Sequence, residues 1–303
     1  MPITRKIMGV AQGGVSKKAI FGYGLLDDGA TQTSLVNLVS NIGVVASDTT
    51  GIGSSRSQLA AASYGTGQAI FGYGTTGSGV DVSMSNKVSS LGIVSTDTTG
   101  VGTSRSALAA ANYGTDKAIF GYGGYNFSNL VSSSGVIAND VSGVGTSRYG
   151  LAAANYGTDK AIFGYGYAST NSSLANLVSS SGVIASDTTG VGTARRFLAA
   201  TNYGLDKAIF GYGTGSAGQV SLTNLVSNVG VVATDTTGVG TARYYLAAAN
   251  YGSDKAIFGY GYSFSTGLVL SLTNLVSSVG VVATDTTGVG TGRRGLAASS
   301  YGS

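Results

Sequence analysis

The side chains of this chain that could act as acids, bases or nucleophiles leave little room for catalysis. Thirteen Asp are its only acidic residues, because Glu is absent, and His and Cys are absent as well. A general acid or base is most often His, Glu or Asp with a tuned pKa, and a nucleophilic Ser needs a base beside it. Ten Asp occupy repeated positions, which leaves Asp27, Asp28 and Asp81 outside the repeat. We therefore expect no catalytic residue, no enzymatic activity and no cofactor.

The repeated Asp form two groups. Six begin a D-T-T-G or D-V-S-G segment, eight residues before an Arg, and four precede a Lys in a turn. The first group is Asp48, Asp97, Asp140, Asp187, Asp235 and Asp285, and the second is Asp116, Asp159, Asp206 and Asp254. We expect Asx-type turns at the first group, with the Arg eight residues later either pairing with the Asp or bonding backbone carbonyls, although a ring of six Arg could instead bind phosphate or sialic acid. One Asp per turn supplies too few oxygen ligands for Ca²⁺, so no metal site is expected.

The segment from Arg243 to Gly261 shows the unit to which these residues belong. Two short apolar runs, LAAA and KAIFGYG, flank the turn N-Y-G-S-D, which is typical of a β-hairpin. A TNLVS-type run and a VVAT-type run follow before the next D-T-T-G link. The Phe of the hairpin recurs along the chain, at Phe21, Phe71, Phe120, Phe163, Phe210 and Phe258. Each unit of roughly 48 residues is therefore predicted to form four short strands.

The repeat fills the chain and predicts a single domain over residues 1–303. The units span approximately residues 5–55, 56–104, 105–147, 148–194, 195–242 and 243–292, with an extra strand at 293–302. Four strands per unit predict an all-β protein, a six-bladed β-propeller of four-stranded antiparallel blades; a β-solenoid or fibre shaft is the rival. Residues 7–11 and 296–302 both resemble the first strand, so pairing of terminal strands is predicted to close the ring.

Composition limits the partners and the location that the sequence predicts. A net charge of +4 is too mild to indicate nucleic-acid binding. No run approaches 18 apolar residues, so no membrane insertion is expected. The N-terminus lacks the apolar core of a signal peptide. We expect a cytoplasmic protein, unless it leaves the cell by assembly into a particle.

The aromatic residues that do not repeat indicate the candidate binding site. Twelve of 18 Tyr and six of nine Phe occupy repeated positions. The others lie after the second strand or just after the repeated Arg, which alternating strand directions place on one face of the molecule. Tyr-rich surfaces suit contacts with sugars or proteins; the alternative is that these rings cover blade edges or pack loops against one another. The predicted binding residues are Tyr125, Phe127, Tyr149, Tyr167, Arg196, Phe197, Tyr244, Tyr245, Tyr262 and Phe264, which Arg294 joins.

An Arg, an apolar strand, a G-D or N turn and a second strand ending in G-Y-G resemble the kelch repeat over residues 5–302. The fourth-strand Trp of kelch is absent. The chain is also similar to Gly-rich repeat proteins of marine bacteriophages. These resemblances imply a recognition or structural propeller, expected in a virion, that binds host glycans or another virion protein and forms an oligomer. An intracellular kelch-type protein-interaction module is the alternative.

Overall fold

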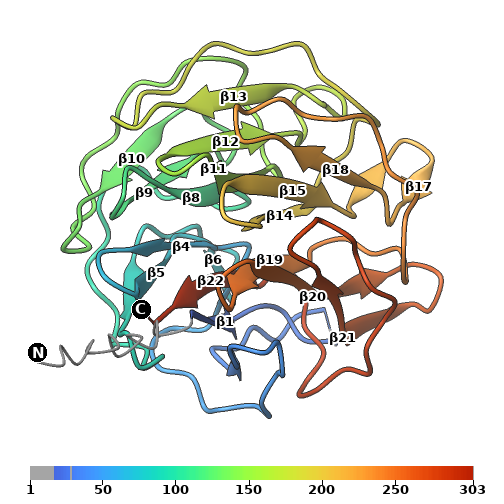
Figure 1. Ribbon diagram of the computed structural model, residues 1–303. Coiled ribbons are helices and arrows are strands. Elements are labelled where there is room, and N and C mark those ends of the chain that lie inside the picture. The colour runs from blue at the N-terminus through green and yellow to red at the C-terminus, as the bar shows by residue number, and fades with distance from the viewer. Residues whose placement is uncertain (1–16, 28, 303) are drawn as a thin grey trace, which may run out of the picture.

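The computed structural model describes residues 17–27 and 29–302, and within them every regular element is a β-strand. Six antiparallel sheets of three strands each follow one another around a common centre (Figure 1). They are β22 (Ala297–Tyr301), β1 (Lys18–Gly22) and β2 (Val36–Val39); β4 (Ala60–Tyr64), β5 (Gln68–Gly72) and β7 (Ser85–Val88); β8 (Ala109–Tyr113), β9 (Lys117–Gly121) and β10 (Ser128–Val131); β11 (Ala152–Tyr156), β12 (Lys160–Gly164) and β13 (Ala175–Val178); β14 (Ala199–Tyr203), β15 (Lys207–Gly211) and β18 (Thr223–Val226); β19 (Ala247–Tyr251), β20 (Lys255–Ser263) and β21 (Leu268–Val276).

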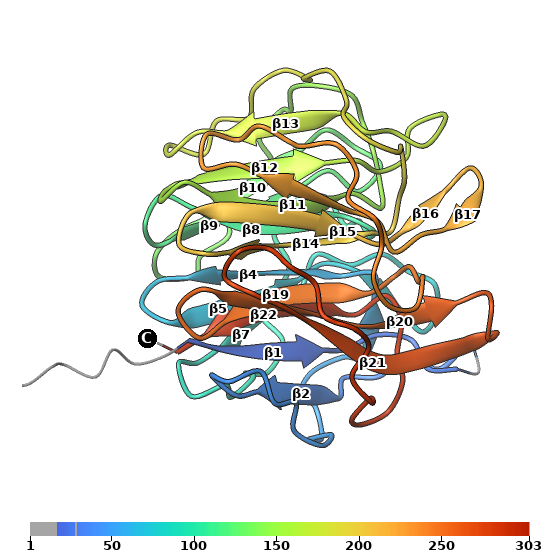
Figure 2. The same cartoon turned by 45° about the vertical axis from the view of Figure 1, so that its right-hand side comes forward.

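Four shorter strands form two small ladders beside these sheets. They are β3 (Arg56–Ser57) with β6 (Thr75–Thr76), and β16 (Thr214–Gly215) with β17 (Gly218–Gln219). Figure 2 shows β16 and β17 projecting from the end of the molecule opposite the C-terminus.

The burial of the strands follows from stacking of the sheets. The middle strand, KAIFG, has its Ala, Ile and Phe fully buried, because a neighbouring sheet covers each of its faces and no apolar–polar alternation is needed. Phe210 on β15 meets the ring of Tyr165 from the preceding sheet edge-on, with centroids 5.1 Å apart. The first strand instead alternates buried and half-buried residues, because one of its faces is turned to the common centre.

The first strands of the sheets contact one another in a cycle: β4, β8, β11, β14, β19, β22 and back to β4. Backbone hydrogen bonds form two further cycles, one at each end of these strands. At the hairpin end the N–H of one turn donates to a carbonyl of the next: Gly65 to Asp116, Gly114 to Asp159, Gly157 to Asp206, Gly204 to Asp254, Gly252 to Lys17 and Gly302 to Gly67. This arrangement is consistent with a repeat propeller.

The C-terminal strand completes the first sheet. β22 pairs antiparallel with β1, and Lys18 faces Tyr301 in that register. The prediction that a terminal strand takes this place is confirmed for the C-terminal copy. The N-terminal copy, at residues 7–11, lies outside the described residues.

The prediction of a fourth full strand in each unit is wrong. The outer segment is joined to the third strand by two isolated bridges, as in Val226 with Val232 and Thr223 with Thr236. Between these bridges the third strand advances three residues and the outer segment four, so one extra residue bulges. At the bulge the side-chain amide of Asn224 donates a hydrogen bond to the carbonyl of Ala233. In a regular ladder a backbone N–H would be the donor.

Candidate ligand-binding face

The repeated Arg lies in a closed polar cluster inside the molecule, as Arg195 shows. Its side chain is fully buried. Nε donates to the carbonyl of Tyr212 at 2.8 Å, and Nη2 donates to Oδ1 of Asn224 at 2.6 Å. The guanidinium lies 4.4 Å from the centre of the Tyr165 ring, a cation–π contact with the preceding sheet. Burial lowers the pKa of Arg195, and the charges of Tyr165 and Asp235 oppose that shift.

Asp235 is the anion of this cluster. Its Oδ1 lies 3.7 Å from Nη1 of Arg195, and its carboxylate accepts from the Thr193 hydroxyl at 2.6 Å and from Asn224 Nδ2 at 2.9 Å. Burial by itself would raise the pKa of Asp235. Hydrogen bonds from Thr193 and Asn224, together with the charge of Arg195, outweigh burial, and the pKa is lowered.

The repeated Arg does bond backbone carbonyls, as Arg195 does at Tyr212, but its predicted pairing with the Asp eight residues before it is wrong. Asp235 pairs with Arg195, forty residues before it, and Asp285 with Arg243. The Arg donates to the Asn of the third strand in all six units: Arg56 to Asn86, Arg105 to Asn129, Arg148 to Asn176, Arg195 to Asn224, Arg243 to Asn274 and Arg293 to Asn37. All six Arg are fully buried, so these guanidinium groups are not exposed to an anion in solution.

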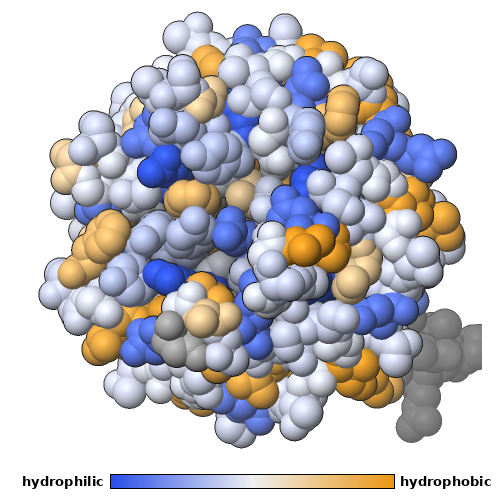
Figure 3. All heavy atoms as spheres, turned by 180° about the vertical axis from the view of Figure 1, so that it is seen from behind, coloured by the Kyte–Doolittle hydropathy of each residue, from blue (hydrophilic) through white to orange (hydrophobic). Residues whose placement is uncertain are grey.

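The residue directly after each buried Arg lies on the face opposite the hairpin turns. In five of the six sheets it pairs with the residue that follows the G-Y-G of the same sheet, as in Tyr149 with Tyr167 and Tyr244 with Tyr262. Non-repeating aromatic residues are thereby brought together in pairs. We call this face the rim; Figure 3 shows it with a recess near its middle.

The paired rings join into one cluster across three sheets. Tyr149 lies 5.3 Å from Tyr167 and 6.1 Å from Phe197 between ring centres. Phe197 stacks on Tyr245 at 4.0 Å and lies 6.1 Å from Tyr244. These contacts carry the cluster from the sheet of β11 to the sheet of β19.

Phe264 ends the cluster on the extension of β20 and β21. It stacks on Tyr244 at 5.2 Å and meets Tyr262 edge-on at 5.5 Å. Phe264 is 61% exposed.

The guanidinium groups of Arg196 and Arg294 lie on these rings. Arg196 is 4.5 Å from the centre of Tyr167, and Arg294 is 4.9 Å from the centre of Tyr262. The described residues show no carboxylate within ion-pair distance of either one.

The structure therefore gathers eight of the ten predicted binding residues. Tyr125 and Phe127 stack on each other at 5.3 Å and, among the described residues, have no ring contact with the others. We call the following set the aromatic arc: Tyr149, Tyr167, Phe197, Tyr244, Tyr245, Tyr262 and Phe264, with Arg196 and Arg294.

Phe197 and Tyr245 lie at the central opening and have positive φ angles. Their φ angles are 54° and 56°, in the left-handed region that bulky residues rarely adopt. The second cycle of backbone hydrogen bonds, at the end of the first strands opposite the hairpin turns, holds them there. Its N–H to carbonyl bonds run from Gln58 to Gly295, Ala107 to Gln58, Gly150 to Ala107, Phe197 to Gly150, Tyr245 to Phe197 and Gly295 to Tyr245. The equivalent residues Gln58 and Ala107 have φ angles of 53° and 51°, so this geometry belongs to the repeat. Burial raises the pKa of Tyr245 to about 12.

A pocket of about 270 Å³ lies beside Tyr245 at this opening. Tyr244, Tyr245 and Arg294 line one side, and Leu25, Ser57, Gln58 and Gly295 line the rest. Sequence reasoning missed Leu25, Ser57 and Gln58. Ser57 and Gln58 are the non-aromatic counterparts of Tyr244 and Tyr245 in another repeat, and that alignment is the signal that could have identified them.

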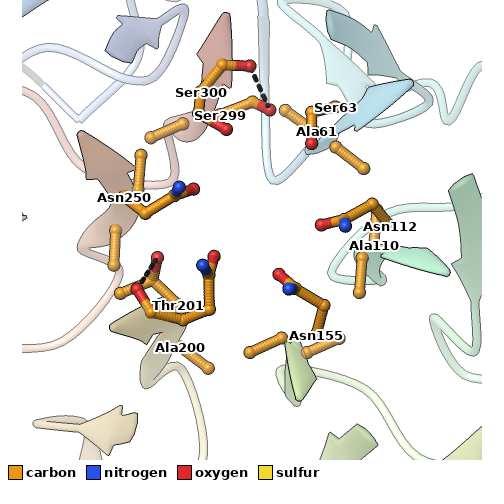
Figure 4. A pocket seen from close by; sticks show the side chains of 18 residues that line it. Ala61, Ser63, Ala110, Asn112, Asn155, Ala200, Thr201, Asn250, Ser299 and Ser300 are labelled. Carbon is orange, nitrogen blue, oxygen red and sulfur yellow. Dashed lines mark hydrogen bonds between the residues drawn. The ribbon is translucent and has the colours of Figure 1, made fainter. Parts of the chain in front are cut away.

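A narrower cavity of about 40 Å³ lies between the six first strands. Figure 4 shows Asn112, Asn155 and Asn250 pointing into it, among alanine side chains. It is large enough for water but not for a sugar ring.

Of the carboxylates outside the repeat, the structure describes Asp27 and Asp81, which bond to separate partners. Asp27 accepts from the N–H of Val269 at 3.1 Å, and Asp81 from the hydroxyl of Thr75 at 2.7 Å. Asp28 lies outside the described residues. Within those residues there is no group of three metal-ligating side chains and no helix long and apolar enough to span a membrane.

No protein-family model matches this chain, and no curated protein matches it either. The kelch resemblance therefore stays a prediction. What the structure establishes is an all-β protein of six repeated small sheets with a recurring buried Arg–Asn–Asp cluster.

Proposed function

We propose that this protein is a non-enzymatic recognition module, a six-bladed β-propeller closed by β22, whose aromatic arc binds a saccharide. One observation carries the proposal. Seven non-repeating aromatic side chains and two Arg form a connected surface on one face, whereas the repeated residues are bonded into the interior.

The chemistry of the arc suits a sugar ring. Tyr presents an apolar ring face and a polar hydroxyl, which match the C–H face and the hydroxyl edge of a saccharide. Phe264 and Tyr244 offer two stacked rings 5.2 Å apart, and the pocket beside Tyr244 adds Ser57 and Gln58 as hydrogen-bonding groups.

Binding without catalysis also fits the ionisable groups of the arc. A general acid or base works best with a pKa near the operating pH. The pKa of Tyr245 is raised to about 12, far from neutral, and the pKa of Tyr244 is also raised by burial. The arc has no carboxylate among its own residues. It therefore offers contact area and cations rather than proton transfer.

A glycan array probed with the purified protein tests this proposal. Wild type is expected to bind at least one glycan class, and the variant Tyr167→Ala/Tyr244→Ala/Phe264→Ala is expected to lose more than tenfold in affinity, because stacked aromatic residues carry much of the binding energy at such surfaces. The melting temperatures of both should agree within a few degrees.

Two control variants sharpen the result. Leu205→Ala, at an exposed hairpin tip on the opposite face, should bind as wild type does. Tyr125→Ala should also bind normally, because Tyr125 lies outside the arc. If no glycan binds wild type, saccharide recognition is refuted, and a partner protein or a second copy of the chain becomes the occupant to test.

Membership of a virion stays an expectation based on resemblance, as does the alternative of an intracellular interaction module. Recovery of the protein with purified particles, or with a soluble cellular complex, separates the two.

A further inference from the structure

The pocket at the central opening combines three kinds of wall. The rings of Tyr244 and Tyr245 form the aromatic wall, Arg294 supplies a positive charge, and Ser57 and Gln58 supply polar groups from the sheet of β4. Its volume of about 270 Å³ lies just below the usual range for drug-sized ligands, about 300–1,000 Å³. One sugar ring fits that size better than an extended oligosaccharide.

Arg294 is held in place without a described anionic partner. Its backbone N–H donates to Leu25 O at 3.0 Å, and its carbonyl accepts from Leu25 N–H at 2.8 Å. Its guanidinium lies over the Tyr262 ring at 4.9 Å. The preceding residue, Arg293, instead has Asp48 at 3.4 Å. Among the described residues no such carboxylate reaches Arg294.

Ser57 has hydrogen-bonding capacity left for a ligand. Its hydroxyl accepts from Gln32 Nε2 at 3.1 Å, so its own proton is available to donate. Ser57 and Gln58 line the pocket together with the aromatic rings, whereas Gln32 is not among the lining residues.

We infer that this pocket selects an acidic saccharide: a ring bearing a carboxylate that pairs with Arg294, while the ring stacks on Tyr244 and its hydroxyls reach Ser57 and Gln58. The inference rests on the proposed function, because it names the sugar class that the arc recognises. Arg is suited to this role, since its planar fork bonds a carboxylate through two parallel N–H donors.

Paired ligands test the inference directly. Calorimetry would compare a panel of uronic acid and sialic acid oligosaccharides with neutral counterparts that lack the carboxylate. Wild type is expected to bind at least one acidic ligand more than tenfold more tightly than its neutral counterpart. Arg294→Gln should reduce that preference to less than twofold, mainly through weaker binding of the acidic ligand.

A charge-matched control separates a specific contact from net charge. Lys207→Gln removes one positive charge at an exposed position on the hairpin face and should retain the acidic preference. Arg294→Lys should retain part of it, because charge remains but the two-pronged contact is lost.

Three results would overturn the inference: an acidic preference that survives Arg294→Gln, an equal loss in Lys207→Gln, or equal binding of acidic and neutral ligands. Equal binding that Tyr244→Ala abolishes leaves the proposed recognition function standing. If no saccharide of either kind binds, both the inference and saccharide recognition fail.

Discussion

Arg195 and Arg196 are neighbours in the chain and lie in opposite surroundings. Arg195 is fully buried and bonded to Asn224 and Tyr212. Arg196 lies on the rim over Tyr167 and has a buried Nε without a hydrogen-bond partner. Arg293 and Arg294 repeat the contrast. The repeated Arg packs in the interior, and the residue directly after it lies on the surface and differs in type between repeats.

The difference separates residues that stabilise the fold from residues of the proposed binding surface. The recurring Arg, Asn and Asp bond to one another within each sheet, so substitution there leaves buried groups unpaired. Residues that differ between units project from the same backbone positions at the rim. Their substitution should change binding while leaving the fold in place.

Paired substitutions at these neighbours should give the largest contrast. Arg195→Ala removes the cation from a buried cluster and leaves Asp235 and Asn224 without their partner, so we expect a loss of about 3–5 kcal/mol in unfolding free energy. Arg196→Ala loses a cation–π contact of about 1 kcal/mol or less. Denaturant melts followed by circular dichroism measure both, and equal losses would remove the distinction between interior and rim.

Two glycines with similar backbone geometry should give a smaller contrast. Gly192 has φ +76°, and an added Cβ would lie 2.4 Å from Oδ1 of Asp235; Gly267 has φ +71° with nothing within 4 Å. Both pay the strain of a positive φ, about 1 kcal/mol or more. Gly192→Ala must also displace a hydrogen-bonded carboxylate, so we expect it to cost at least about 2 kcal/mol more. Matching melting temperatures for the two variants would contradict this expectation.

Lowering the pH should reduce the free energy of unfolding, and each Asp should contribute less to this loss than the substitutions above. The pKa of Asp235 is lowered in the folded state, so its contribution is complete above the unfolded value of about 4 and is lost as the pH falls through the folded value. Five other Asp have the same direction of shift: Asp48, Asp97, Asp140, Asp187 and Asp285.

Unfolding free energy measured between pH 6 and pH 2 should therefore fall steadily below about pH 4. Asp235→Asn should make the fall shallower, because one of the six titrating groups is gone. Arg196→Gln should leave the slope unchanged. A slope that Asp235→Asn does not alter would show that this carboxylate has no role in acid stability.

The strands and the separation of the two faces followed from the sequence. The turn N-Y-G-S-D between two apolar runs predicted the hairpin of β19 and β20, and the structure pairs Tyr251 with Lys255 across it. Alternating strand directions placed the segments containing Tyr149 and Tyr262 on one face. The full fourth strand was not correctly predicted. The β-propensity of V-V-A-T does not reveal that the side chain of Asn224 donates a hydrogen bond to the carbonyl of Ala233.

The partners of the charged residues required the folded chain. Spacing suggested that Asp235 would pair with Arg243, yet the outer segment of each sheet lies beside the Arg that precedes the first strand of the same sheet, so Asp235 pairs with Arg195 and Asp285 with Arg243. Likewise, no local pattern joins Ser57 to Tyr244, which lie at opposite ends of the chain and meet in one pocket.

The sequence by itself determined the repeating unit, its all-β character and the list of residues that differ between repeats, because these depend on local periodicity and turn chemistry. Only the tertiary structure decided which Asp neutralises which Arg, which terminal strand pairs with β1 and which side chains share the central opening. The Asp–Arg pairs depend on how the outer segment of a sheet lies beside the start of its first strand, and the other two depend on how six sheets are arranged around one centre. The spacing of residues along the chain does not reveal such contacts.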